Sequence, residues 1–117
     1  PIPLHLQGES QAAVLTGEAT LDGNEVFVQW NGQGDRDLGS DTINEMIAIP
    51  RRAIITSDRW KLAICEGDDG ELFDLNADPF EMINLYHEPE HQDRVRRLTT
   101  RLHEWQQRVG DTAPLPS

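Results

Sequence analysis

Side chains that act as nucleophiles are few in this sequence, and none has the spacing of a catalytic motif. The single cysteine, Cys65, follows Leu62-Ala63-Ile64, so we interpret it as a small hydrophobic residue of a strand. One cysteine excludes an intrachain disulfide and a cysteine-based zinc cluster. The sequence has no G-x-S-x-G elbow, no glycine-rich phosphate loop and no H-E-x-x-H motif. We therefore expect that this chain by itself is not a catalyst.

Acidic residues and histidines are the other candidates for chemistry, as ligands of a metal ion. Asp74-x-Asn76-x-Asp78 resembles the start of a calcium loop, but Pro79 stands where such a loop needs glycine. Residues 35–41 are similarly incomplete. We interpret both segments as turns in which Asp and Asn side chains bond the local backbone. No metal-ligand pair on one helix face is predicted for the four histidines, which we interpret as surface residues: His5, His87, His91 and His103.

The elements that position these side chains are indicated by residue patterning. Runs rich in β-branched and aromatic residues predict four strands, over residues 25–30, 52–56, 59–64 and 71–75. A turn at Ser57-Asp58 makes the second and third strands a hairpin, and residues 67–70 form another turn. A polar, glycine-rich loop is predicted over 31–37. Residues 43–49 fit either a short helix or a strand, which Pro50 ends because it has no N–H to donate.

A long helix is predicted from Pro89 to Val109. Proline suits the first helical position, and Gly110 is a typical C-terminal stop. Apolar residues recur at spacings of three and four and share one face of this helix: Val95, Leu98, Leu102, Trp105 and Val109. One apolar stripe must cover something, most simply the sheet. The predicted fold class is α+β, an antiparallel sheet of about four strands packed by one long C-terminal helix.

Composition excludes several classes of partner. The 117 residues allow one domain, and 21 Asp and Glu against 10 Lys and Arg give a net charge of −11. Nucleic acids and anionic membrane surfaces need a cationic face, so neither is expected as a partner. No apolar run approaches the roughly 20 residues of a membrane span. We expect a soluble protein of the bacterial cytoplasm or periplasm.

The N-terminal segment is predicted to be a connector. Residues 1–24 are a small-residue stretch punctuated by Gly8, Gly17 and Gly23. The chain begins at Pro1 without a methionine, so we expect it to be a piece of a larger protein.

Four elements of the C-terminal half resemble, in order and at family spacing, the C-terminal part of sulfatases. Residues 52–62, RAIITSDRWKL, are similar to the strand pair R-A-V-R-T-x-x-Y/W-K, and residues 71–75, ELFDL, to E-L-Y-D-L. Residues 78–85, DPFEMINL, match D-P-x-E-x-x-N-L, and an amphipathic helix containing Trp105 follows. Weaker matches lie upstream, in 3–9 and 26–31. The family often has a second arginine where Ile55 stands, so any contact made by that side chain is absent here.

The resemblance implies a fragment of an enzyme of the alkaline-phosphatase-like superfamily. Such sulfatases have a larger N-terminal catalytic domain with a calcium ion and a formylglycine made from Cys or Ser in a C/S-x-P-x-R signature. Cys65 is followed by neither the proline nor the arginine, so it is not this nucleophile. The resemblance therefore implies that residues 1–24 connect to a missing catalytic domain, and that 25–117 form the C-terminal subdomain. No catalytic or metal-binding residue is expected in the chain.

The leading hypothesis is thus a structural, cleft-shaping part of a sulfatase that hydrolyses sulfate esters. Loop position makes Trp30, Asn31 and Arg52 the candidates for contact with substrate. Two alternatives stay open at this point. One is the same subdomain of a phosphonate or phosphate monoester hydrolase, and the other is a non-catalytic, acidic interaction module.

Overall fold

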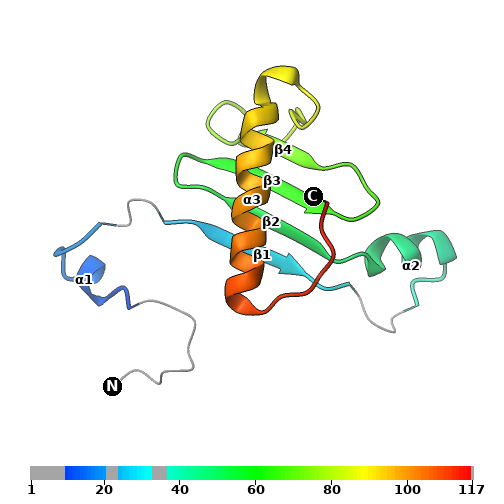
Figure 1. Ribbon diagram of the computed structural model, residues 1–117, viewed down its shortest axis with the longest axis horizontal. Helices are drawn as coiled ribbons and strands as arrows, with labels where there is room; N and C mark the ends of the chain where they lie inside the picture. The colour runs from blue at the N-terminus through cyan, green and yellow to red at the C-terminus, as the bar shows by residue number, and fades with distance from the viewer. Residues whose placement is uncertain (1–9, 21–23, 33–36, 117) are drawn as a thin grey trace.

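The centre of the molecule is a four-stranded antiparallel sheet in the order β1-β2-β3-β4 (Figure 1). The computed structural model describes residues 10–20, 24–32 and 37–116. The strands are β1 (Val26–Trp30), β2 (Arg51–Ile55), β3 (Trp60–Cys65) and β4 (Glu71–Asp74). Each predicted strand and the predicted hairpin are confirmed, with boundaries that differ by one residue at most.

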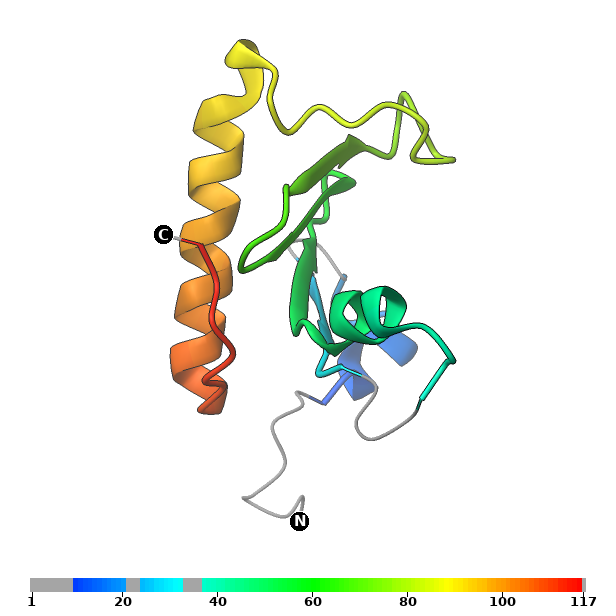
Figure 2. The same ribbon diagram turned by 90° about the vertical axis from the view of Figure 1, so that its right-hand side faces the viewer.

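One long helix lies across a single face of this sheet (Figures 1 and 2). It is α3 (Gln92–Val109), and its first turn is preceded by the 3₁₀ turn η1 (Pro89–His91). Gly110 ends the helix in the left-handed region, at φ 71°, where residues other than glycine are strained. The α+β fold class and the C-terminal helix are therefore confirmed.

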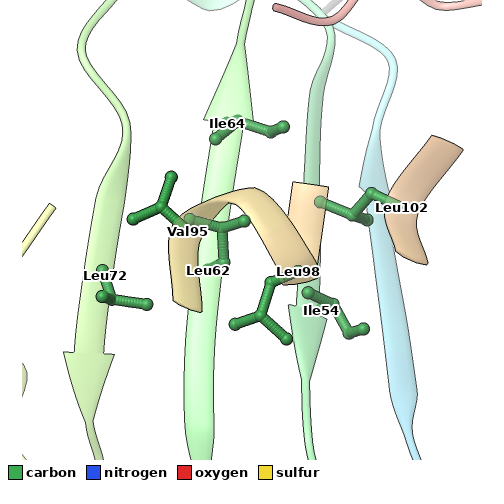
Figure 3. Packing of buried hydrophobic residues seen from close by; sticks show 7 residues of the cluster. All are labelled: Ile54, Leu62, Ile64, Leu72, Val95, Leu98 and Leu102. Atoms are coloured by element: carbon green, nitrogen blue, oxygen red, sulfur yellow. The ribbon is translucent and has the colours of Figure 1, made fainter. Parts of the chain in front are cut away.

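The hydrophobic core fills the layer between sheet and helix (Figure 3). Strand residues meet residues of α3 in one cluster: Ile54, Leu62, Ile64, Leu72, Val95, Leu98 and Leu102. Trp105, the fourth residue of the predicted stripe, is partly buried and stacks on Phe27 of β1, with centroids 5.2 Å apart and planes at 3°. This stack ties the edge strand β1 to the helix.

Residues 43–49, for which the sequence fitted either a short helix or a strand, belong mostly to a helix, α2 (Asp41–Ala48). It lies on the side of the sheet opposite α3 (Figure 2). The indole of Trp30 donates a hydrogen bond to the Ile47 carbonyl at 3.1 Å. Gly32, at φ 86°, passes so close that an added Cβ would lie 2.6 Å from the Ala48 carbonyl oxygen. The end of β1 is thus held against the C-terminal end of α2.

The N-terminal segment contributes no buried residue in its described part. Its helix α1 (Ala12–Leu15) has four residues, and Leu15 is 88% exposed. Residues 1–9 and 21–23, with the upstream match at 3–9, lie outside the described residues, as do 33–36 of the predicted loop. The division into a connector and a subdomain stays a prediction. Within the described ranges, no helix has the length and apolar character needed to cross a membrane.

Candidate functional site

The three predicted site residues meet around one guanidinium group. Arg52 donates from Nη1 to the Trp30 carbonyl at 2.8 Å and from Nη2 to Asn31 Oδ1 at 2.8 Å. This is possible because Trp30 pairs with Arg51 at the end of the β1–β2 ladder, so Arg52 lies one residue inside that end. The structure therefore brings together the residues that loop position singled out.

Asp111 completes this cluster, and no sequence pattern indicated it. Its carboxylate accepts from Arg52 Nε and Nη2, both at 2.7 Å, in a two-pronged pair between residues 59 apart. Gln106 of α3, which is buried, donates to the same carboxylate at 2.9 Å. The four side chains Asn31, Arg52, Gln106 and Asp111 are called the Arg52 cluster below.

The guanidinium of Arg52 is fully used within the chain. A fifth bond runs from Nη1 to the Arg51 carbonyl at 2.9 Å, so each of its five N–H groups has an acceptor. The residue is 2% exposed. A buried arginine with no spare donor acts as a structural link between β1, β2 and the segment after α3. Trp30, 47% exposed, and Asn31, also exposed, are the members of the predicted site that a ligand can reach.

The hydrogen bonds from Arg52, with smaller contributions from Gln106 and the Ala113 N–H, hold the pKa of Asp111 far below its ordinary value. A carboxyl whose folded pKa is lowered contributes stability above the pKa of the unfolded chain, about 3.9, and this contribution is lost as pH falls toward the folded pKa. The Arg52 cluster is therefore expected to be weakened by acid below about pH 4.

Asp111→Asn is expected to lower the free energy of unfolding at pH 7 and to flatten its dependence on pH between about 4 and 2. The amide cannot lose a proton, so the variant has no such stabilisation to lose. Urea denaturation from pH 7 to 2 measures the effect. Asp69→Asn removes the same charge from an exposed side chain and is the matched control. Equal slopes for wild type and Asp111→Asn would contradict this prediction.

The acidic segment after β4 is a turn, as predicted. Asp74 Oδ1 accepts from the Asn76 N–H at 2.9 Å, and Asp78 Oδ2 accepts from the Ile83 N–H at 2.8 Å. Asn84 bonds the backbone on both sides of β4's first residue, through the Leu72 N–H and the Gly70 carbonyl. These side chains shape the backbone of the turn. Leu85, at the end of the turn, packs against the core, whereas Leu75, at its start, is half-buried outside the cluster.

The described part of the chain does not fit the metal ion and the activated nucleophile that a sulfatase requires. Over the described ranges, no three His, Cys, Asp or Glu side chains lie together in a way that could hold a metal ion. Cys65 is 1% exposed at the end of β3, and burial raises the pKa of its thiol. A buried thiol with a raised pKa is a weak nucleophile and a packed core residue. Its interpretation as a small hydrophobic residue is confirmed.

On the face of the sheet turned away from α3, the side chains of β1 are apolar and partly exposed. Because Phe27 points to α3, its neighbours Val26 and Val28 point to the opposite face, where they are 50% and 48% exposed. The ladder pairs them with Ile55 and Ala53, which share that face. We call these four residues and Trp30 the open sheet face. It continues toward α2, where Ile43 and Met46 are exposed.

Comparison with known proteins gives one family and one relative. The family described as "N-sulphoglucosamine sulphohydrolase, C-terminal" matches residues 1–108. A protein named "Ulvan-active sulfatase", from Formosa agariphila, is 31% identical over 75 residues, which are 64% of this chain and 13% of that protein. The chain thus spans a small fraction of the length of its relative. With residues 1–108 matched, the chain belongs to the family of N-sulphoglucosamine sulphohydrolase C-terminal domains.

Proposed function

We propose that this chain is the C-terminal domain of a sulfatase that hydrolyses sulfate esters, and that it shapes the substrate cleft without taking part in the chemistry. The match of residues 1–108 to sulphohydrolase C-terminal domains carries the proposal. The nucleophile and the metal site are assigned to a catalytic domain that precedes these residues. Calcium and formylglycine belong to that domain in the proposal, so no catalytic step is written for this chain.

The open sheet face is proposed to pack against that catalytic domain. The face holds Val26, Val28 and Trp30, each about half exposed, and the alternation along β1 places them together. Contiguous apolar surface of this kind typically marks a surface that is covered in the complete protein. The occupant proposed here is the catalytic domain of the same polypeptide, because the chain belongs to a family of C-terminal domains and its 75 aligned residues cover only 13% of its relative.

Trp30 and Asn31 are proposed to form the part of this domain that contacts substrate. They lie at the exposed end of β1, at the border between the open sheet face and solvent. Arg52, the third predicted site residue, is proposed as a positioning residue. Its bonds to the Trp30 carbonyl and to Asn31 Oδ1 hold that end of the strand in place.

The experiment for the activity uses the complete protein that contains residues 1–117. Purified protein is assayed with an aryl sulfate, an aryl phosphate and an aryl phosphonate, each as a monoester. A higher kcat/KM for the sulfate ester than for the phosphate and phosphonate esters supports the proposal. A preference for the phosphate or phosphonate ester assigns the domain to a monoester hydrolase instead, and no turnover of any ester overturns the enzymatic assignment.

Trp30→Ala in the complete enzyme is expected to raise KM roughly fivefold while kcat changes less than twofold. Loss of a contact made equally in the ground state and the transition state changes KM alone, and about 1 kcal/mol corresponds to this factor. Steady-state kinetics with the best substrate measures both constants. Phe80→Ala, at an exposed aromatic residue in the turn after β4, is the control and should leave both unchanged. An unchanged KM for Trp30→Ala removes Trp30 from the cleft.

A further inference from the structure

A small cavity lies between the β2–β3 turn and α3, apart from the Arg52 cluster. Its volume is about 140 Å³, the space of roughly four or five water molecules. It is lined by Thr56, Asp58, Arg94, Arg97, Leu98 and Arg101. Three arginines and one aspartate thus line the cavity, in a chain whose net charge is −11.

Helical spacing explains how the three arginines reach one cavity. Residues 94, 97 and 101 are separated by three and four positions, so their side chains lie in one row on α3. The core residue Leu98 lies beneath them and forms the apolar floor. The row therefore stands between the packed core and solvent, with Arg94 partly buried and the other two arginines exposed.

Two of the three arginines are held in position by other side chains. Arg94 lies over the Trp60 ring, 3.9 Å from its centroid, and bonds Asp58 at 3.2 Å. Arg101 pairs with Glu25. Asp58 is itself fixed by the Thr56 hydroxyl, and this bond, with that from Arg94, keeps the pKa of Asp58 below its usual range.

Arg97, between them, differs from its neighbours. Across the described ranges it has neither an ion-pair partner nor a hydrogen-bonded acceptor, and its side chain is exposed. A free planar guanidinium between two fixed ones offers several N–H donors to one ligand. Tetrahedral oxyanions match this arrangement, because guanidinium groups donate two parallel hydrogen bonds to such oxygens.

We propose that this cavity is a binding site for a sulfate group, with Arg97 as its principal ligand and Arg94 and Arg101 beside it. The choice of sulfate among the oxyanions rests on the proposed function. The group is either the free sulfate ion or a sulfate carried by a saccharide. This site is distinct from the one at Trp30 and Asn31. Thr56 follows the last residue of β2, whereas Arg52, which bonds Trp30 and Asn31, lies near the first residue of that strand.

The test is a titration of the ¹⁵N-labelled 117-residue chain with sodium sulfate, read at the arginine Nε–Hε resonances. Saturable shifts are expected for Arg94, Arg97 and Arg101, and not with sodium chloride at equal ionic strength. Arg97→Ala is expected to weaken sulfate binding about tenfold, because a charge-assisted donor is lost. Arg108→Ala removes the same charge from the same helix outside the cavity and should bind as wild type does.

Two results overturn the site. One is that sodium chloride reproduces the Nε–Hε chemical-shift changes, and the other is that Arg97→Ala and Arg108→Ala lose sulfate affinity to the same extent. An amide spectrum of Arg97→Ala that matches wild type outside α3 shows that the variant is folded. A second arm titrates a singly and a multiply sulfated oligosaccharide. Affinity at least tenfold above that of sulfate ion assigns the site to a saccharide, and equal affinity assigns it to the free ion.

The titration needs no catalytic activity, so its outcome is independent of the assays with the complete protein. A complete protein that hydrolyses no sulfate ester overturns the proposed function and leaves a positive titration standing. Conversely, sulfatase activity of the complete protein, together with chemical-shift changes that sodium chloride reproduces, overturns the sulfate site and leaves the proposed function standing.

Discussion

Replacing Arg52 with alanine is expected to lower the free energy of unfolding of this chain by about 3 kcal/mol. The substitution removes five hydrogen bonds and leaves the Asp111 carboxylate, whose side chain is 12% exposed, without its cation. Removing one partner of a buried ion pair costs 3–5 kcal/mol in general. The lower end is expected because Asp111 lies just after α3 and keeps its bond from Gln106.

Urea denaturation at pH 7 measures the loss, and Arg51→Ala is the matched control. Arg51 is the neighbouring residue, and its pair with Asp68 is 36% and 47% exposed, so its removal is expected to cost less than about 1 kcal/mol. The double variant Arg52→Met with Asp111→Ala is expected to recover more than half of the loss, because no unpaired charge stays buried. A loss below 1 kcal/mol for Arg52→Ala contradicts the structural role assigned to this side chain.

Replacing Leu102 with alanine is expected to destabilise the chain by about 3 kcal/mol. Leu102 is fully buried, at 0% exposure, and lies in the core beside Ile54 and Leu98 (Figure 3). Shortening it removes apolar contacts and leaves a cavity between the sheet and α3, which the rigid layer on either side cannot refill.

Thermal and urea denaturation measure this effect, with Leu15→Ala as control. That leucine is 88% exposed in α1, so the same change there is expected to stay within about 0.5 kcal/mol. Equal effects at the two leucines would show that α3 does not form the core with the sheet in solution.

Local patterning was sufficient to predict the four strands and the long helix α3. Alternation and turn residues predict β2 and β3 to within one residue. Of the predicted apolar stripe of α3, Val95, Leu98 and Leu102 are buried and the other two residues are partly buried, whereas buried Gln106 was not predicted. Residues 43–49 were ambiguous because a short apolar segment has no clear period, and the structure makes them part of α2. The order of motifs from Arg52 to Val109 also indicated the family, since these turns and strands occur at characteristic spacing.

The candidate site was only partly predictable. Loop position singled out Trp30, Asn31 and Arg52, and the structure brings them together. The sequence carried no sign that Arg52 is buried or that Asp111 is its partner. An arginine in a strand is expected at the surface, because arginine is rarely buried without a charged partner. The partner here follows α3, far along the chain.

By itself the sequence determined the α+β elements, the absence of a catalytic motif and the resemblance to sulfatases, because these depend on local patterns and on their order along the chain. The tertiary structure decided which charged groups meet. Arg52 bonds Asp111 across 59 residues, and Arg94 bonds Asp58 across 36. Such pairs form because α3 lies across the sheet, and that packing depends on the whole apolar core rather than on any short pattern.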